Sequence, residues 1–160
     1  MKKCIILQIN YLILICLFIP CVAIAQPICQ IQRFSAYNGL AQRSVTNILQ
    51  DSKGFIWFST WNGLNKFDGY TFKNYKAFPG DGCTLTSNRL AKITQTQTCD
   101  IWCQTYDLRI YLFDSRREKF IDILRPYENE KQQTYAVQNV YTLPKGVSWI
   151  VCDRGAFRID

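Results

Sequence analysis

Hydrophobic and polar positions recur along this chain with a period of about 46 residues. Tryptophans stand 45 and 47 residues apart, at Trp57, Trp102 and Trp149. Eleven or twelve residues after each tryptophan, an apolar residue precedes an aspartate, at Asp68, Asp114 and Asp160. Recurrence of two different markers at one period indicates an internal structural repeat.

Each repeat contains the same series of short segments typical of β-strands. An apolar first strand is expected at 45–49, 90–93 and 140–143, and a turn with glycine or proline follows two of them. The second strand contains the tryptophan and is apolar without alternation, so both of its faces are expected to be covered. A third strand ends at the aspartate, and Asp68-Gly69 is a hairpin signal before a fourth strand at 70–75. Four strands in about 45 residues are typical of a β-propeller blade.

The predicted fold class is therefore all-β, a partial β-propeller of four-stranded antiparallel blades behind a signal peptide. Residues 34–37 match the fourth strand at 72–75, which predicts an orphan outer strand without a blade. The expected segments are a signal peptide, the orphan strand with a linker, two blades and an incomplete third blade, at 1–25, 26–44, 45–89, 90–139 and 140–160. About two and a half blades do not close a ring of four to eight, so we expect part of a longer protein or a truncated product.

The N-terminus has the pattern of an export signal. Lys2 and Lys3 precede an apolar run at 5–24, and Ala23-Ile24-Ala25 offers a small-x-small cleavage site. We expect cleavage near Ala25 and a periplasmic mature chain. An uncleaved membrane anchor is the alternative. Three polar or proline residues within the apolar run argue against it.

Composition excludes several classes of function. The 160 residues contain no histidine, so no imidazole base, histidine metal ligand or phospho-accepting histidine is available. Without Lys2 and Lys3, 17 basic and 12 acidic residues leave a net charge of +5, and Arg116-Arg117 is the only adjacent basic pair after the signal. No nucleic-acid surface is therefore predicted. Cys99 and Cys103 have no second pair, so neither a metal site nor a cofactor is predicted.

The recurring residues have structural and functional interpretations. Trp57, Trp102 and Trp149 could stack on sugars, but their repetition favours packing between blades. Asp68, Asp114 and Asp160 could be catalytic carboxylates, but recurrence at a strand end favours a role in turns. Cys103 and Cys152 lie at strand positions and are expected to be small buried apolar residues, without a role as nucleophiles. No catalytic residue is predicted.

Four residues are the candidate ligand contacts. Trp61 lies outside the repeated tryptophan position, in the loop after the second strand, and Tyr106 replaces it in the next unit. Asp107 and Arg109 lie beside Tyr106 and could bind a polar ligand by hydrogen bonds. The alternative is an ordinary solvated loop.

The first unit resembles the two-component regulator propeller repeat. The resemblance is carried by YNGL at 37–40, QDSKGFIWF at 50–58 and TWNGLNKFDGY at 60–70. It extends over about 31–160 and weakens in later units, where Arg109-Ile110-Tyr111 stands in place of Gly63-Leu64-Asn65.

The resemblance implies the periplasmic sensor region of a hybrid two-component histidine kinase in glycan-degrading bacteria. Such proteins combine stacked propellers, an immunoglobulin-like connector, a membrane span, a kinase, a receiver and a DNA-binding module. This chain would then be an input segment without a catalytic module, and its ligand a glycan-derived oligosaccharide. Its partners would be the remaining blades and kinase of a longer chain, and a second copy in a full-length homodimer. A piece of a propeller carbohydrate-active enzyme and a truncated product without function are the alternatives.

Overall fold

The computed structural model describes residues 29–77 and 85–160. The chain divides into two compact units, 1–32 and 33–160. In the first unit, the described residues 29–32 form no helix or strand and are exposed to solvent. The predicted signal peptide lies outside the described residues.

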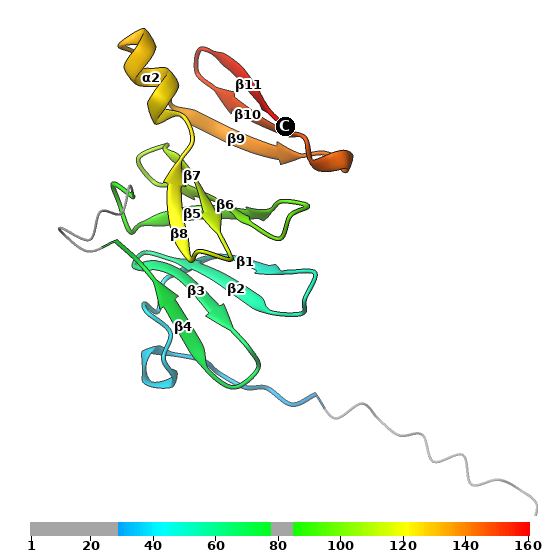
Figure 1. Cartoon of the computed structure of the whole chain (residues 1–160). Helices are drawn as coiled ribbons and strands as arrows, with labels where there is room; N and C mark the ends of the chain where they lie inside the picture. The colour runs from blue at the N-terminus through cyan, green and yellow to red at the C-terminus, as the bar shows by residue number, and fades with distance from the viewer. Residues whose placement is uncertain (1–28, 78–84) are drawn as a thin grey trace, which may run out of the picture. The chain divides into compact units, whose positions relative to one another are not determined.

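The second unit consists of three antiparallel sheets (Figure 1). Sheet 1 contains β1 (Val45–Gln50), β2 (Ile56–Thr60), β3 (Gly63–Phe67) and β4 (Phe72–Tyr75), in that order. Sheet 2 contains β5 (Leu90–Gln95), β6 (Ile101–Thr105), β7 (Ile110–Asp114) and β8 (Lys119–Asp122), also in order. Sheet 3 contains β9 (Val137–Thr142), β10 (Ser148–Cys152) and β11 (Gly155–Ile159), with β10 in the centre. The predicted all-β partial propeller is confirmed.

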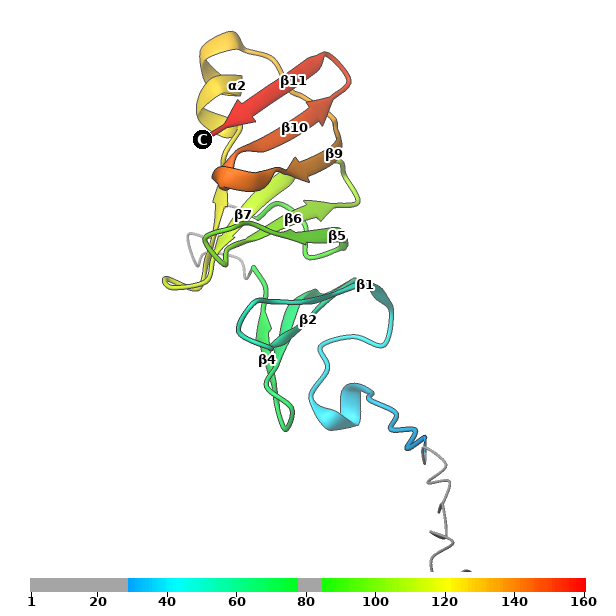
Figure 2. The same cartoon turned by 90° about the vertical axis from the view of Figure 1, so that its right-hand side faces the viewer.

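In the described ranges, three short helices accompany the sheets. They are the 3-10 helices η1 (Ala36–Asn38) and η2 (Pro144–Gly146) and the α-helix α2 (Arg125–Lys131). The helix α2 lies between β8 and β9 in the sequence, and Figure 2 shows it beside sheet 3. The repeat pattern did not predict this insertion, and β9 begins at Val137, three residues before the expected start of the third unit.

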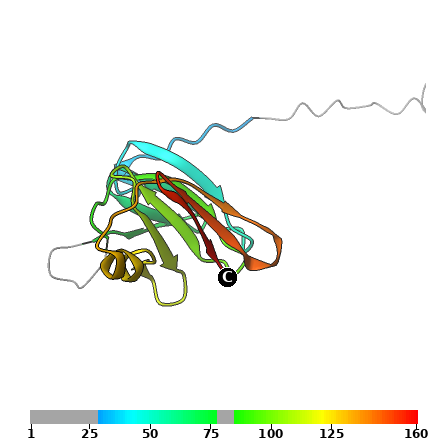
Figure 3. The same cartoon turned by 90° about the horizontal axis from the view of Figure 1, so that it is seen from above.

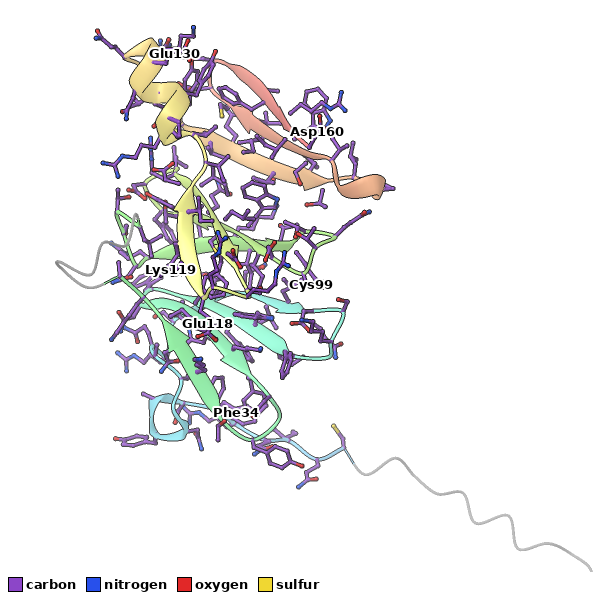
Figure 4. The ribbon with its side chains drawn as sticks, in the orientation of Figure 1. Phe34, Cys99, Glu118, Lys119, Glu130 and Asp160 are labelled. Carbon is purple, nitrogen blue, oxygen red and sulfur yellow. The ribbon has the colours of Figure 1, made fainter. Side chains whose placement is uncertain are left out.

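The predicted orphan strand at 34–37 is wrong, because this segment contains η1. A strand needs a neighbour for its backbone groups. Here the Ser35 N–H donates instead to Asn38 Oδ1 at 3.0 Å, and Gly39 ends the turn with a φ of 99°. The segment still covers sheet 1, since the ring centroid of Phe34 lies 4.9 Å from that of Phe67 and 5.7 Å from that of Phe72 (Figure 4).

Sheets 1 and 2 share one hydrophobic core centred on Trp57. Its indole is 2% exposed, stacks on Tyr75 with centroids 5.9 Å apart, and meets Phe113 edge-on at 5.7 Å. The indole Nε1–H donates to Asp51 Oδ2 at 2.9 Å. The other oxygen of Asp51 accepts the backbone N–H groups of Lys53 and Phe55, so one carboxylate holds both the turn and the core residue.

Sheets 2 and 3 share a second core that contains Trp102, which is also 2% exposed. The indole N–H of Trp102 donates to Ser148 Oγ of sheet 3 at 3.1 Å. Trp149 is 37% exposed, because strand register places it with Tyr141 and Arg158 on the opposite face from the buried Ile150. Figure 3 shows the three sheets from above.

The repeated aspartates lie where β3, β7 and β11 end. Asp68 Oδ1 accepts the N–H groups of Tyr70 and Thr71, at 2.8 and 2.7 Å. Asp114 Oδ1 accepts two N–H groups in the same way, from Arg116 and Arg117. Hydrogen bonds from the following turn lower the pKa of both carboxyls, those from Thr71 and Arg117 most. Asp160 is held differently, by an ion pair with Arg158.

Replacing the buried tryptophan should be far more costly than replacing an exposed one. Trp57→Ala should lower the free energy of unfolding by about 3–5 kcal/mol, as is typical when a buried aromatic is truncated. Trp61→Ala and Trp149→Ala, whose rings are 42% and 37% exposed, should cost much less. Urea unfolding monitored by circular dichroism would measure all three, and equal losses would contradict the division into core and surface aromatics.

Candidate functional site

One backbone hydrogen bond recurs in all three sheets and fixes the turn after the second strand. The N–H of the first turn residue donates to the carbonyl of the residue that precedes the first strand of the same sheet. The donor and acceptor are Trp61 and Ser44 at 3.3 Å, Tyr106 and Arg89 at 3.0 Å, and Asp153 and Ala136 at 3.0 Å. The three turns therefore occupy equivalent positions at one end of their sheets.

Threonines shape the first two turns. Thr60 Oγ1 accepts the Asn62 N–H and donates to the Gly63 carbonyl. Thr105 Oγ1 makes the matching contacts with the N–H and carbonyl of Arg109. The second turn, measured from Thr105 to Arg109, is one residue longer than the first, measured from Thr60 to Gly63. Leu108 accommodates the extra residue with a φ of 60°.

Gly63 is required where the first turn enters β3. Its φ is 97°, and a Cβ atom there would lie 2.3 Å from the carbonyl oxygen of Tyr75. The Gly63 N–H also donates to the Asn88 carbonyl at 2.7 Å, which connects this turn to the segment before β5. These constraints hold the turns of sheets 1 and 2 next to each other.

The structure brings two of the predicted ligand contacts together. The rings of Trp61 and Tyr106 meet nearly at right angles, with centroids 6.2 Å apart. They are 42% and 50% exposed. The Arg89 guanidinium lies over both, 4.6 Å from the centroid of Trp61 and 5.6 Å from that of Tyr106. Sequence reasoning missed Arg89, although its place just before a first strand, opposite the turn aromatic, could have indicated it.

Asp107 lies in the same turn as Tyr106, and its carboxylate is exposed. Asp107 Oδ2 accepts a hydrogen bond from Thr86 Oγ1 at 3.1 Å. That hydroxyl is also 2.8 Å from the hydroxyl of Tyr111, which is buried. Asp107 is therefore oriented by the segment that carries Arg89.

Arg109 has protein partners that the sequence did not indicate. Its guanidinium donates to both carboxylate oxygens of Glu128 on α2, at 2.7 and 2.6 Å, and to Asp122 at 3.2 Å. These contacts, led by the Glu128 hydrogen bond, raise the pKa of Arg109. Burial alone would raise the pKa of Glu128, but hydrogen bonds from Arg109 and the Tyr135 N–H outweigh it and lower that pKa. Arg109 thus connects α2 to sheet 2 through these hydrogen bonds. A ligand contact by Arg109 stays a prediction.

The remaining candidates for metal ligands and nucleophiles are polar and thiol groups. Within 29–77 and 85–160, no three His, Cys, Asp or Glu side chains are grouped closely enough to hold a metal ion. Cys103 and Cys152 are buried free thiols, and burial raises the pKa of each, which disfavours the thiolate. In the same ranges, no helix has the length and apolar character needed to cross a membrane.

A family model matches part of the first repeat. Residues 39–62, which include β1, β2 and the turn with Trp61, match the family model of the two component regulator propeller. The predicted resemblance to this family is confirmed. The matched residues include the Asp51–Trp57 pair, so the match falls on the segment that organises sheet 1.

Proteins similar to this chain include components of signalling systems. Histidine kinase P4 of Formosa agariphila is 47% identical over 53 residues, which are 33% of this chain and 4% of that protein. The extracellular domain of a hybrid two component system from B. thetaiotaomicron is 28% identical, with a TM-score of 0.62, over 74% of this chain and 17% of that one. The extracellular domain of a one component system from the same organism shares the fold at 20% identity and a TM-score of 0.57, over 82% and 18%. The chain thus spans less than a fifth of each.

The Arg109–Glu128 pair should make stability sensitive to acid. Because the folded pKa of Glu128 is lowered from 4.5, the unfolded chain takes up the proton first, and stability should fall as the pH drops below about 4.5. Glu128→Gln should cost about 1.5–3 kcal/mol at pH 7, as a lost hydrogen bond to a charged group does. The difference from the unsubstituted chain should shrink toward pH 3.

Urea unfolding between pH 7 and pH 3 would test this prediction. Glu130→Gln on the same helix is the matched control, because the Glu130 side chain is 68% exposed and forms a surface ion pair with Lys131. A Glu128→Gln defect that is equal at pH 7 and pH 3 would show that the ion pair does not cause it.

Proposed function

We propose that this chain is a ligand-sensing propeller segment of an exported two-component signalling protein, and that its ligands are glycan-derived oligosaccharides. The observation that carries the proposal is the solvent-exposed aromatic pair of Trp61 and Tyr106, which two adjacent blades supply. The family match at 39–62 and the similarity to an extracellular domain of a hybrid two component system support the signalling context.

The aromatic pair has the chemistry that a sugar ligand needs. The C–H faces of a pyranose ring are apolar and pack on exposed aromatic rings, while its hydroxyls need hydrogen-bonding partners. Asp107, next to Tyr106, supplies a carboxylate that accepts hydrogen bonds from hydroxyls. A ligand at this position would contact both blades, so its binding would depend on how they are packed.

A catalytic role for the recurring aspartates receives no support from their contacts. Glycoside hydrolysis uses a specific pair of carboxyl groups on either side of the scissile bond. Asp68 and Asp114 instead bind the backbone of their own turns. In this proposal the chain binds without catalysis. Its partners are further blades and a kinase in the signalling protein, and a second copy of that protein in a homodimer.

Removing the turn aromatics should weaken ligand binding without unfolding the chain. Trp61→Ala and Tyr106→Ala should each reduce oligosaccharide affinity about 3- to 10-fold, since an aromatic contact contributes about 0.5–1.5 kcal/mol. A glycan array followed by titration calorimetry would measure the effect. Trp149→Ala, which removes an exposed tryptophan from sheet 3, is the matched control. Unchanged affinity in the turn variants, or no glycan bound by the unsubstituted chain, would refute the proposal.

A further inference from the structure

Arg89 is a cation held in place by aromatic rings. Its backbone is fixed at both sides, because its N–H donates to Ser87 Oγ at 3.2 Å and its carbonyl accepts the Tyr106 N–H. Its guanidinium lies over Trp61 and Tyr106. Among residues 29–77 and 85–160 that guanidinium forms no ion pair and donates no hydrogen bond. In contrast, the Arg109 guanidinium is paired with two carboxylates.

The fold does not require an arginine at this position. Ser44 and Ala136 occupy the equivalent places before β1 and β9 and accept the same backbone hydrogen bond. The turn residues that bind them are Trp61 and Asp153. Among these three turns, a cation lies over two aromatic rings where sheets 1 and 2 meet. The Arg89 side chain thus adds a positive charge that the repeat does not need for folding.

A guanidinium placed in this way is suited to an anionic group. Arginine presents a planar set of N–H donors that matches the two oxygens of a carboxylate or sulfate. Contact with two rings limits the rotamers of the side chain, so less conformational entropy is lost when an anion binds. The nearest acidic group in the turn, Asp107, is already hydrogen-bonded to Thr86.

We propose that Arg89 binds the carboxylate or sulfate of an acidic sugar, while the exposed parts of Trp61 and Tyr106 contact the sugar rings. This inference rests on the proposed function and narrows its ligand class from oligosaccharides in general to anionic ones. Arg89 is then the residue that determines specificity, and the aromatic pair supplies contact area that neutral and acidic sugars share.

The test uses the whole chain and three sets of oligosaccharides of matched length: oligogalacturonides, sulfated galactan fragments and neutral galactan fragments. Fluorescence or calorimetric titration would give affinities for the unsubstituted chain, Arg89→Gln and Arg89→Lys. Arg116→Gln is the matched control. It removes the same charge from an exposed residue in the turn between β7 and β8, at the other end of sheet 2 from Tyr106.

We expect at least one anionic set to bind more tightly than the neutral set, with an affinity that falls at high salt. Arg89→Gln should weaken that binding about 10-fold or more, as loss of a charge-assisted pair does. Arg89→Lys should retain part of it, and Arg116→Gln all of it. Because Arg89→Lys keeps the positive charge, it also provides the measurement if Arg89→Gln is poorly folded.

Three results would overturn the inference. If neutral fragments bind as tightly as anionic ones, or if Arg89→Gln and Arg116→Gln have equal effects, the anionic specificity fails and the proposed sensing of oligosaccharides remains. If no fragment of any set binds, the inference fails, and the glycan array then decides whether the proposed function fails with it.

Discussion

The burial of one tryptophan between neighbouring sheets is the constraint on which this fold depends. A buried indole contributes a large apolar area, but its N–H needs an acceptor, and an unsatisfied donor there would cost about 1–3 kcal/mol. Asp51 accepts the indole N–H of Trp57, and Ser148 of the next sheet accepts the indole N–H of Trp102. In the first case, the acceptor also orders the turn that starts the strand, so local structure and core packing are coupled through one carboxylate.

Polar contacts between sheets 1 and 2 are placed around this core. Thr46 Oγ1 donates to the Leu90 carbonyl at 2.8 Å. Glu118, which lies in the turn just before β8 (Figure 4), accepts hydrogen bonds from Lys73 and Tyr75 of sheet 1. These hydrogen bonds lower the pKa of Glu118, with the contact from Lys73 contributing most. Because both sheets are fixed in this way, the two turns that carry the aromatic pair are positioned by the packed blades and not by their own contacts alone.

Sequence pattern predicted the features that depend on local periodicity. The spacing of Trp57 and Trp102 and the recurring series of strand segments predicted the four-stranded sheets, in which each strand pairs with its neighbour along the chain. Sequence pattern wrongly predicted a strand at 34–37 and did not predict the helix α2. A match to strand composition does not supply a partner strand, and Pro126 at the start of α2 begins a helix that belongs to no repeat.

The candidate site was only partly predictable, because side-chain partners depend on contacts distant in sequence. Trp61 and Tyr106 could be found from their equivalent turn positions. Arg89 acts on a ring 28 positions earlier in the chain, and Arg109 is neutralised by a glutamate on an inserted helix. Arg89 and Arg109 therefore have different partners, and the spacing of residues in the sequence does not reveal these partners.

In each blade, the groups that stabilise the fold are different from the side chains that vary at the turn. The recurring contact at the turn joins backbone groups, so serine, arginine and alanine all support it equally. Stability resides in the tryptophan core and in this backbone contact, which leaves the side chains at the turn free to differ between blades. A ligand site can therefore change at these positions without loss of the fold. For the same reason, the Arg89 guanidinium, which lies over two exposed rings and forms no ion pair within 29–77 and 85–160, is a feature of these turns that the repeat does not require for folding.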